Sequence, residues 1–238
     1  MTHKDNKFRE MTEMTQPLPG IKPRERVSDL DYVYSQLSRA IMMGEFEPGQ
    51  KLKLKELSAA FNTSHMPIRE ALARLTVAQV VTTEPRRSVH VPFVNCKRLS
   101  DLIEVRIKLE RMAITLVSTV PDPQMALELE AINKRFETVL QAQEPDFKAY
   151  LAINHEFHFA IYNSCGNPEL INLIEQMWMR YGPLLHGLRQ GPTKFAQRDH
   201  HREMIEAIRS GKPKAARDAI ESDLRDAAVQ IAAALPDE

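Results

Sequence analysis

The amino-acid sequence predicts a mostly α-helical protein, in which a small amino-terminal domain of three helices and a β-hairpin precedes an all-α bundle of six to seven helices. Three observations lead to this fold class. Apolar residues recur every three or four positions through most of the chain. β-Branched runs are confined to residues 80–91. Proline and glycine separate the periodic segments. The 238 residues, 43% of them hydrophobic, suffice for two domains.

The composition is balanced overall but uneven along the chain. Residues 1–94 carry 14 Lys/Arg against 11 Asp/Glu, and the remainder carries 18 against 21. A mildly basic first half is compatible with nucleic-acid binding. The two cysteines, Cys96 and Cys165, form neither a metal-binding spacing nor a disulfide framework. No apolar run approaches the roughly 18 residues of a membrane span, and no signal-peptide core is found. We therefore expect a cytoplasmic protein without a membrane partner.

The amino-terminal domain is predicted over residues 29–93, after a disordered tail at 1–28 that is polar and broken by prolines. Its first helix has Asp31 as a plausible N-cap and ends at Gly44. The apolar face of that helix consists of Val33, Leu37 and Ile41. A second helix places Leu54, Leu57 and Phe61 on one face.

The third helix, Ser64–Leu75, begins at a possible N-cap and has Pro67 in its first turn. Its buried stripe consists of Ile68, Ala71, Leu72 and Leu75. Arg69 and Arg74 are left on other faces. Taken alone, this pattern also fits an ordinary amphipathic surface helix.

The segment that follows predicts a strand at 80–84, a turn at 85–88 and a second strand at 89–91, with Arg86 and Arg87 at the tip. Three short helices followed by a hairpin make a winged helix-turn-helix. Such a domain lays its third helix in the major groove, and a basic wing tip can reach phosphates or the minor groove. For the two arginines alone, a solvated turn is the alternative.

The second domain is predicted over residues 95–234, where every periodic segment is helical. Asn95 and Asp122 are predicted N-caps, and Gly166-Asn167-Pro168, Gly182-Pro183 and Gly211 are breaks. The predicted helices span residues 95–118, 122–142, 146–163, 168–180, 194–209 and 213–234, with a short segment after Pro183. This is an all-α bundle.

Five polar residues interrupt the apolar stripes of this bundle. Arg106 falls in the stripe of Leu99, Leu102, Leu109, Ala113 and Leu116. Asn154 and His158 fall in the stripe of Phe147, Leu151 and Ile161. His201 precedes Met204 and Ile208, and Asp223 lies among Ala216, Ile220 and Ala227. Burying an unpaired charge costs several kcal/mol, so these groups need partners and are expected to converge.

A converged set suits a divalent metal ion. Asn154 and His158 are spaced as i and i+4, and His201 and Asp223 complete two imidazoles and two oxygens. This donor set fits zinc, nickel or manganese, and Arg106 would clamp a small carboxylate beside the ion. The alternative is a metal-free network in which Arg106 pairs with Asp223. We expect His155 and His200 to face elsewhere, and we assign no role to His186.

Three segments of the first half resemble the GntR-family DNA-binding domain: Met43-Gly44-Glu45-Phe46-Glu47-Pro48-Gly49-Gln50-Lys51-Leu52, Glu56-Leu57-Ser58, and Ser64 through Leu72. The resemblance covers about residues 30–92. It implies DNA contacts from Lys55, His65, Met66 and Arg69. His65 stands where the family has arginine and Met66 where it has threonine or serine, so we expect a different base preference there. We add Ser64, Arg74, Arg86 and Arg87 to the predicted DNA-binding set.

The second half resembles the FCD effector domain of the FadR subfamily over about residues 95–232. The similar segments are Glu104 through Glu110, Phe157-His158, Gly166-Asn167-Pro168, His201 through Ile208, and Gly211 with Ala216. The resemblance implies a metal site at Asn154, His158 and His201, with Asp223 in place of the usual last histidine. It also implies small organic acids or sugar acids as effectors.

These observations predict a bacterial transcription regulator, a repressor rather than an enzyme, that binds a pseudo-palindromic DNA operator as a homodimer and associates with the nucleoid when bound. Two other functions fit the same residues. A metal-dependent hydrolase could use His158, His201 and Asp223 to activate water. In the other alternative, the second domain only dimerises a DNA-binding protein.

Overall fold

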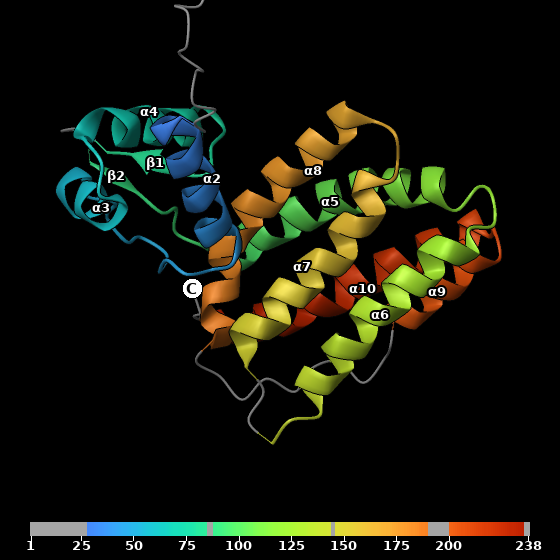
Figure 1. The fold of residues 1–238 in the computed structure, drawn as a ribbon. Coiled ribbons are helices and arrows are strands. Elements are labelled where there is room, and N and C mark those ends of the chain that lie inside the picture. Colours follow the sequence, from blue (N-terminus) through green and yellow to red (C-terminus); the bar gives the residue numbers. More distant parts are fainter. Residues whose placement is uncertain (1–27, 85–87, 144–145, 190–199, 236–238) are drawn as a thin grey trace, which may run out of the picture.

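The structure, a computed structural model, describes residues 28–84, 88–143, 146–189 and 200–235. Helices and two short strands from the first part of the chain gather at one end of the molecule, and the remaining helices form a bundle beside them (Figure 1). The predicted fold class is confirmed. Residues 1–27 of the tail predicted to be disordered lie outside the described residues, as do the hairpin-tip arginines, Arg86 and Arg87.

The amino-terminal unit contains α2 (Asp29–Met42), α3 (Leu54–Phe61), α4 (His65–Val77), β1 (Thr82–Thr83) and β2 (Val89–His90). The strands pair antiparallel, with Thr82 opposite His90. They are shorter than predicted because the backbone N–H groups of Val80 and Val81 donate to the carbonyl oxygen of Leu75 in α4, and not to the other strand. The core between α2 and α4 is built from Val33, Leu37, Ile68, Ala71 and Leu75.

The start of α2 corrects one sequence prediction. The N-cap is Ser28, whose hydroxyl accepts a hydrogen bond from the backbone N–H of Asp31. Asp31 lies in the first helical turn, where its negative charge interacts favourably with the helix dipole. Ser64 holds the N-cap position of α4, but its side chain makes no capping hydrogen bond.

The bundle contains α5 (Cys96–Val117), α6 (Pro123–Leu140), α7 (Phe147–Asn163), α8 (Pro168–Tyr181), the 3₁₀ helix η1 (Gly182–Arg189), α9 (His200–Arg209) and α10 (Pro213–Ala234). Side chains of Asn95, Asp122, Asp146 and Asn167 cap four of these helices. Residues 194–199, predicted as the first part of the helix at 194–209, lie outside the described residues.

Helix α10 packs between α5 and α9, α8 lies across α5, and α6 packs on α7 and α9 (Figure 1). The described helices include none with the length and apolar character needed to cross a membrane. The buried face of α5 differs from the predicted stripe. Leu116 is 48% exposed and Leu109 is only partly buried, whereas Ile107, Glu110 and Ile114 are buried. The reason is that α7, α8 and α10 cover α5 from several sides.

The two halves meet where the end of α2 contacts the end of α8. A Cβ atom on Gly182 would lie 2.0 Å from the carbonyl oxygen of Ile41, so only glycine fits this approach. Arg180 donates from Nε to the carbonyl oxygen of Ala78 at 2.9 Å. The Nδ1 atom of His186 lies 3.0 Å from the carbonyl oxygen of Gly44, which gives this histidine a contact at the junction.

Candidate functional site

Three of the predicted ligand residues converge from three helices. His158 of α7, His201 of α9 and Asp223 of α10 each offer a ligand atom, and these atoms all lie within 4.8 Å of one another. The two histidines are almost fully buried. His158 Nε2 lies 3.3 Å from the Asp223 carboxylate. Periodicity therefore identified side chains that are distant in sequence and adjacent in space.

A hydrogen-bond chain orients the ring of His158. The hydroxyl of Tyr162 contacts a carboxylate oxygen of Glu110 and lies 3.1 Å from His158 Nδ1. Because the Glu110 carboxylate can only accept, the Tyr162 hydroxyl donates to it, and the hydroxyl oxygen accepts a hydrogen bond from the Nδ1–H of His158. This leaves Nε2 directed at Asp223. A proton or a metal ion must then stand between the Nε2 lone pair and the carboxylate.

The ring of His201 is oriented in the same manner. Its Nδ1 lies 3.0 Å from Oδ1 of Asn133, whose amide group in turn donates to Glu137 at 3.0 Å. The carbonyl oxygen of Asn133 can only accept, so Nδ1 carries the proton and Nε2 carries the lone pair. The ring stacks on Phe157 with centroids 3.8 Å apart. Burial, with the nearby charge of His158, lowers the pKa of His201 to about 3, so the ring is neutral at pH 7.

The carboxylate of Asp223 provides the negative charge of the cluster. Burial opposes its ionisation, but the hydrogen bond and charge of His158 prevail and lower its pKa to about 2. Two imidazole nitrogens and one carboxylate oxygen form a donor set that zinc and its neighbours accept. A pocket in the bundle is lined by His158 and Asp223, and also by Asn154, which lies one helical turn before His158.

Arg106 is buried, with 3% of its surface exposed, and lines this pocket. Its Nε donates to Glu110 at 2.7 Å, and its guanidinium lies 4.5 Å from the Trp178 ring and 4.2 Å from the Tyr181 ring. Burial lowers the pKa of Arg106, but the charge of Glu110 more than compensates, so the pKa lies above its ordinary value. The structure pairs Arg106 with Glu110 and not with Asp223, so the alternative pairing predicted from the sequence is wrong.

Glu110 was missed by the sequence reasoning. Its carboxylate accepts from Arg106, from Tyr162 and, at 3.1 Å, from the indole nitrogen of Trp178, and it is fully buried. The available signal was its i+4 spacing from Arg106, which favours an ion pair on one helix. Glu110 thus links the arginine to the histidine that faces Asp223.

Neither His155 nor His200 is a member of the cluster. His155 stacks on Phe159 with centroids 4.1 Å apart, and burial lowers its pKa to about 4. His200 was expected to face elsewhere, but it is buried and lines the pocket. Its Nε2 lies 2.8 Å from Asp226 and its Nδ1 lies 3.2 Å from Glu203. It is therefore engaged with carboxylates beside the cluster.

The pocket also has a wall from the first half of the chain. Met42 and Met43, at the carboxyl end of α2, line it together with Arg106, His158 and Asp223. This contact joins residues more than 60 positions apart, and no local pattern predicts it.

Those predicted DNA-binding residues that the structure describes are exposed on the amino-terminal unit. Lys55, Ser64, His65, Met66 and Arg69 are exposed on α3, on α4 or at its N-cap. Arg74 points back to α2, where its Nη1 lies 3.4 Å from Asp31 and its guanidinium lies 5.9 Å from the Tyr34 ring.

Two exposed lysines, Lys51 and Lys53, were missed by the sequence reasoning, although they alternate with leucines just before Lys55. They line one groove with Arg69 and residues of β1 and β2. This placement makes them further candidates for phosphate contacts.

Known proteins share both halves of the chain. Residues 31–91 match the family model "Bacterial regulatory proteins, gntR family", and residues 101–226 match "FCD domain". The HTH-type transcriptional regulator McbR of Escherichia coli is 33% identical over 184 residues, covering 77% of this chain and 82% of that protein. The HTH-type transcriptional repressor GlaR of Escherichia coli is 24% identical over 148 residues, covering 61% of this chain and 67% of that protein.

The solved structure of Escherichia coli McbR/YncC superposes with a TM-score of 0.80 at 26% identity, covering 87% of this chain and 98% of that one. The relatives are transcription regulators and not enzymes, and the hydrolase alternative finds no support among them. The chain belongs to the GntR family of bacterial transcription regulators and carries an FCD domain after its DNA-binding domain.

Proposed function

We propose that this protein is a repressor of the FadR subfamily, whose affinity for a pseudo-palindromic operator is changed by a small carboxylate bound between Arg106 and a divalent metal ion. One observation supports the regulatory link above all. Met42 and Met43 belong to the DNA-binding half and line the same pocket as Arg106 and His158. An occupant of that pocket would therefore touch both domains.

The proposed metal ligands are Nε2 of His158, Nε2 of His201, the carboxylate of Asp223 and the amide oxygen of Asn154. A bound ion would supply an electrophilic anchor for one carboxylate oxygen of the effector. Arg106 would bind the other end of the effector through its terminal guanidinium nitrogens, because its Nε already donates to Glu110. Zinc, nickel and manganese remain the candidate ions.

The proposed route to DNA is short. Tyr181 contacts the guanidinium of Arg106, and the next residue, Gly182, contacts the last turn of α2. Helix α2 packs against the recognition helix α4. A ligand that moves Arg106 would therefore shift α2 and, in a dimer, the separation of the two recognition helices.

The protein contains a single tryptophan, Trp178, and its ring lies over Arg106. We expect its fluorescence to change when a bound acid reaches Arg106, and the same acid to change operator affinity by about 5- to 150-fold. Zinc-loaded protein would be titrated with a panel of di- and tricarboxylates by fluorescence and calorimetry. DNA affinity would be measured by anisotropy on genomic fragments selected by the protein.

A panel in which no acid releases heat would contradict the effector proposal and favour a second domain that only dimerises. A fluorescence change without any change in DNA affinity would contradict the coupling between the pocket and α2.

Lys55→Ala is expected to weaken binding to all DNA sequences alike. Each protomer would lose one phosphate contact, which should reduce the slope of log K against log salt concentration by about 0.9 per bound protomer. Arg74→Ala provides the matched control, because Arg74 contacts Asp31 within the domain and we propose that it orients α4 rather than binding DNA. An unchanged slope for Lys55→Ala would remove this residue from the proposed interface.

A further inference from the structure

A second groove, which we call the junction groove, lies where the two halves of the chain meet. Gln79 and Phe93 line it from the first half, and Arg98 of α5 and Arg180 of α8 line it from the bundle. Its volume is about 480 Å³, within the range of small-molecule sites in proteins. It shares no lining residue with the pocket of the histidine cluster.

Arg98 occupies an unfavourable place for a cation. It lies in the first turn of α5, the end of a helix that carries partial positive charge. Its Nε is buried from solvent, and no described residue accepts a hydrogen bond from it. Burial and the nearby charge of Arg180 lower the pKa of Arg98, and burial lowers the pKa of Arg180. Both guanidinium groups nevertheless keep their charge at pH 7, because the ordinary pKa of arginine is so high.

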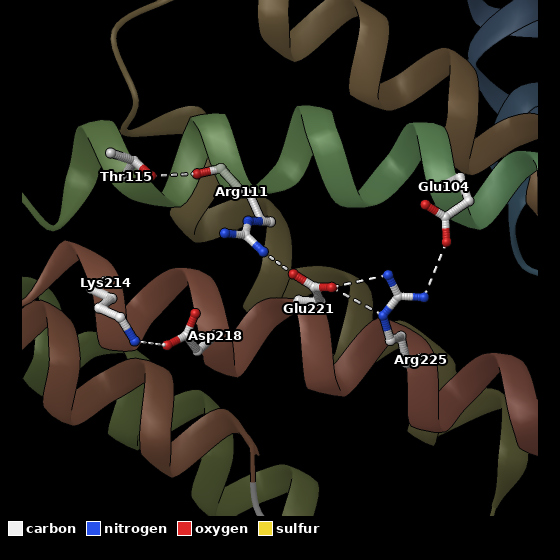
Figure 2. Close-up of polar contacts among 7 residues, drawn as sticks. All are labelled: Glu104, Arg111, Thr115, Lys214, Asp218, Glu221 and Arg225. Carbon is white, nitrogen blue, oxygen red and sulfur yellow. Dashed lines mark hydrogen bonds and ion pairs between the residues drawn. The ribbon is translucent and has the colours of Figure 1, made fainter.

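Other arginines of the bundle have carboxylate partners. Figure 2 shows Arg111 of α5 and Arg225 of α10 both paired with Glu221. Among the residues that the structure describes, no carboxylate forms such a pair with Arg98 or Arg180. Two guanidinium groups that share a groove without a counter-charge are typical of a site that an anion completes.

The charge balance of the junction groove indicates the kind of anion. Lys97 and Asp101 also line it, but the Lys97 Nζ lies 2.8 Å from the Asp101 carboxylate, so these two charges cancel. The two guanidinium groups remain. Arg180 donates from Nε to the carbonyl oxygen of Ala78, which leaves its terminal nitrogens available. Two forked donors match a dianion with several oxygens, whereas a single carboxylate would neutralise only one of them.

We propose that Arg98 and Arg180 bind the phosphate group of a small phosphorylated molecule in the junction groove. The ring of Phe93 is 73% exposed and offers an apolar surface to the organic part of that molecule. This site needs neither the metal ion nor the organic acid of the proposed function.

The position of the groove favours a small molecule over a phosphate of the DNA backbone. The residues predicted to contact bases lie at the start of α4, whereas Gln79 follows its end. The 13 residues of α4 span about 20 Å. Because Arg180 also bonds to Ala78, the C-cap of α4, a phosphate bound by both arginines would tie this helix to the bundle.

Calorimetry with inorganic phosphate tests the site on the full chain, against chloride at equal ionic strength. Arg98→Gln and Arg180→Gln should each weaken phosphate binding at least about tenfold, because each removes charged hydrogen bonds to the anion. Arg225→Gln is the matched control. It removes the same charge from an arginine that already has carboxylate partners, so phosphate affinity should stay at the wild-type value. Circular dichroism would establish equal folding.

Thermal unfolding separates a binding role of Arg98 from a structural one. In chloride buffer, Arg98→Gln should unfold at a temperature at least as high as the wild type, because it removes the repulsion from Arg180. Phosphate should raise the unfolding temperature of the wild type, and it should raise that of Arg98→Gln less. A residue that serves only the structure would lower the unfolding temperature in both buffers when replaced.

Three results would overturn the inference: no heat from phosphate in the wild type, equal effects of Arg98→Gln and Arg225→Gln, or a less stable Arg98→Gln in both buffers. A smaller salt slope of DNA binding in Arg98→Gln would overturn the small-molecule assignment and place a DNA phosphate in the groove. Zinc calorimetry and Trp178 fluorescence report on the other pocket and should be unchanged in Arg98→Gln, so failure of the proposed function is detected separately.

Discussion

Replacing His158 with alanine is expected to lower the affinity for a divalent ion by at least about 100-fold. The change removes one of two imidazole ligands, and it also removes the group that hydrogen-bonds both Tyr162 and Asp223. Mutating groups that merely orient a ligand costs about 10- to 100-fold in metal affinity, so loss of a ligand should cost at least as much. Elemental analysis of purified protein and zinc calorimetry would measure the change.

His155→Ala provides the control for this prediction. His155 lies on the same helix, three residues before His158, but it stacks on Phe159 and is not a member of the cluster. Its replacement should leave metal content unchanged. Equal metal content in wild type and His158→Ala would discard the ligand assignment and favour the metal-free network.

Those parts of the fold that depend on nearby residues were predictable. An N-cap side chain bonds to a backbone N–H two or three residues further on, so Asn95 and Asp122 could be identified from their immediate sequence. Asp31 was a wrong choice because Ser28 is also a good cap and two aspartates follow it. Both aspartates favour the first turn of the helix, so the pattern fits either start.

The candidate site was predictable to the extent that polar residues interrupt apolar stripes. His158, His201 and Asp223 were located in this way, and the structure brings them together. Glu110 was missed because a stripe indicates the direction in which a helix is buried but not the width of the buried face. Leu116 shows the opposite error. It was predicted to be buried because it belongs to an apolar stripe, but no described helix of the same chain covers it fully.

The wall formed by Met42 and Met43 was not predictable from periodicity. These residues lie at the end of α2, and their contact with the pocket depends on how the two halves pack. That packing is fixed by the close approach of Gly182 to Ile41, a contact between residues 141 positions apart. Local patterns contain no information on such a contact.

Replacing Glu110 with alanine is expected to lower the free energy of unfolding by about 3–5 kcal/mol. The change leaves the guanidinium of Arg106 buried without a counter-charge, and loss of one partner of a buried pair carries a penalty of this size. It also removes the acceptor for Tyr162 and Trp178. Urea unfolding, followed by circular dichroism, would measure the difference.

Glu104→Ala is the matched control, because it removes the same residue type from the same helix. Its ion pair with Arg225 is about half exposed on both sides, so its loss should cost less than about 1 kcal/mol. An equal effect at both positions would show that burial of the Arg106–Glu110 pair has no energetic consequence.

The double variant Glu110→Leu with Arg106→Met separates stability from ligand binding. Removing both charges eliminates the uncompensated guanidinium, so most of the lost stability should return. The same variant lacks the proposed anion clamp and should show no fluorescence response to organic acids, while its histidine cluster still binds zinc. If the double variant folds, binds zinc and still responds to an acid, the effector contacts some other group, and Arg106 serves only the structure of the bundle.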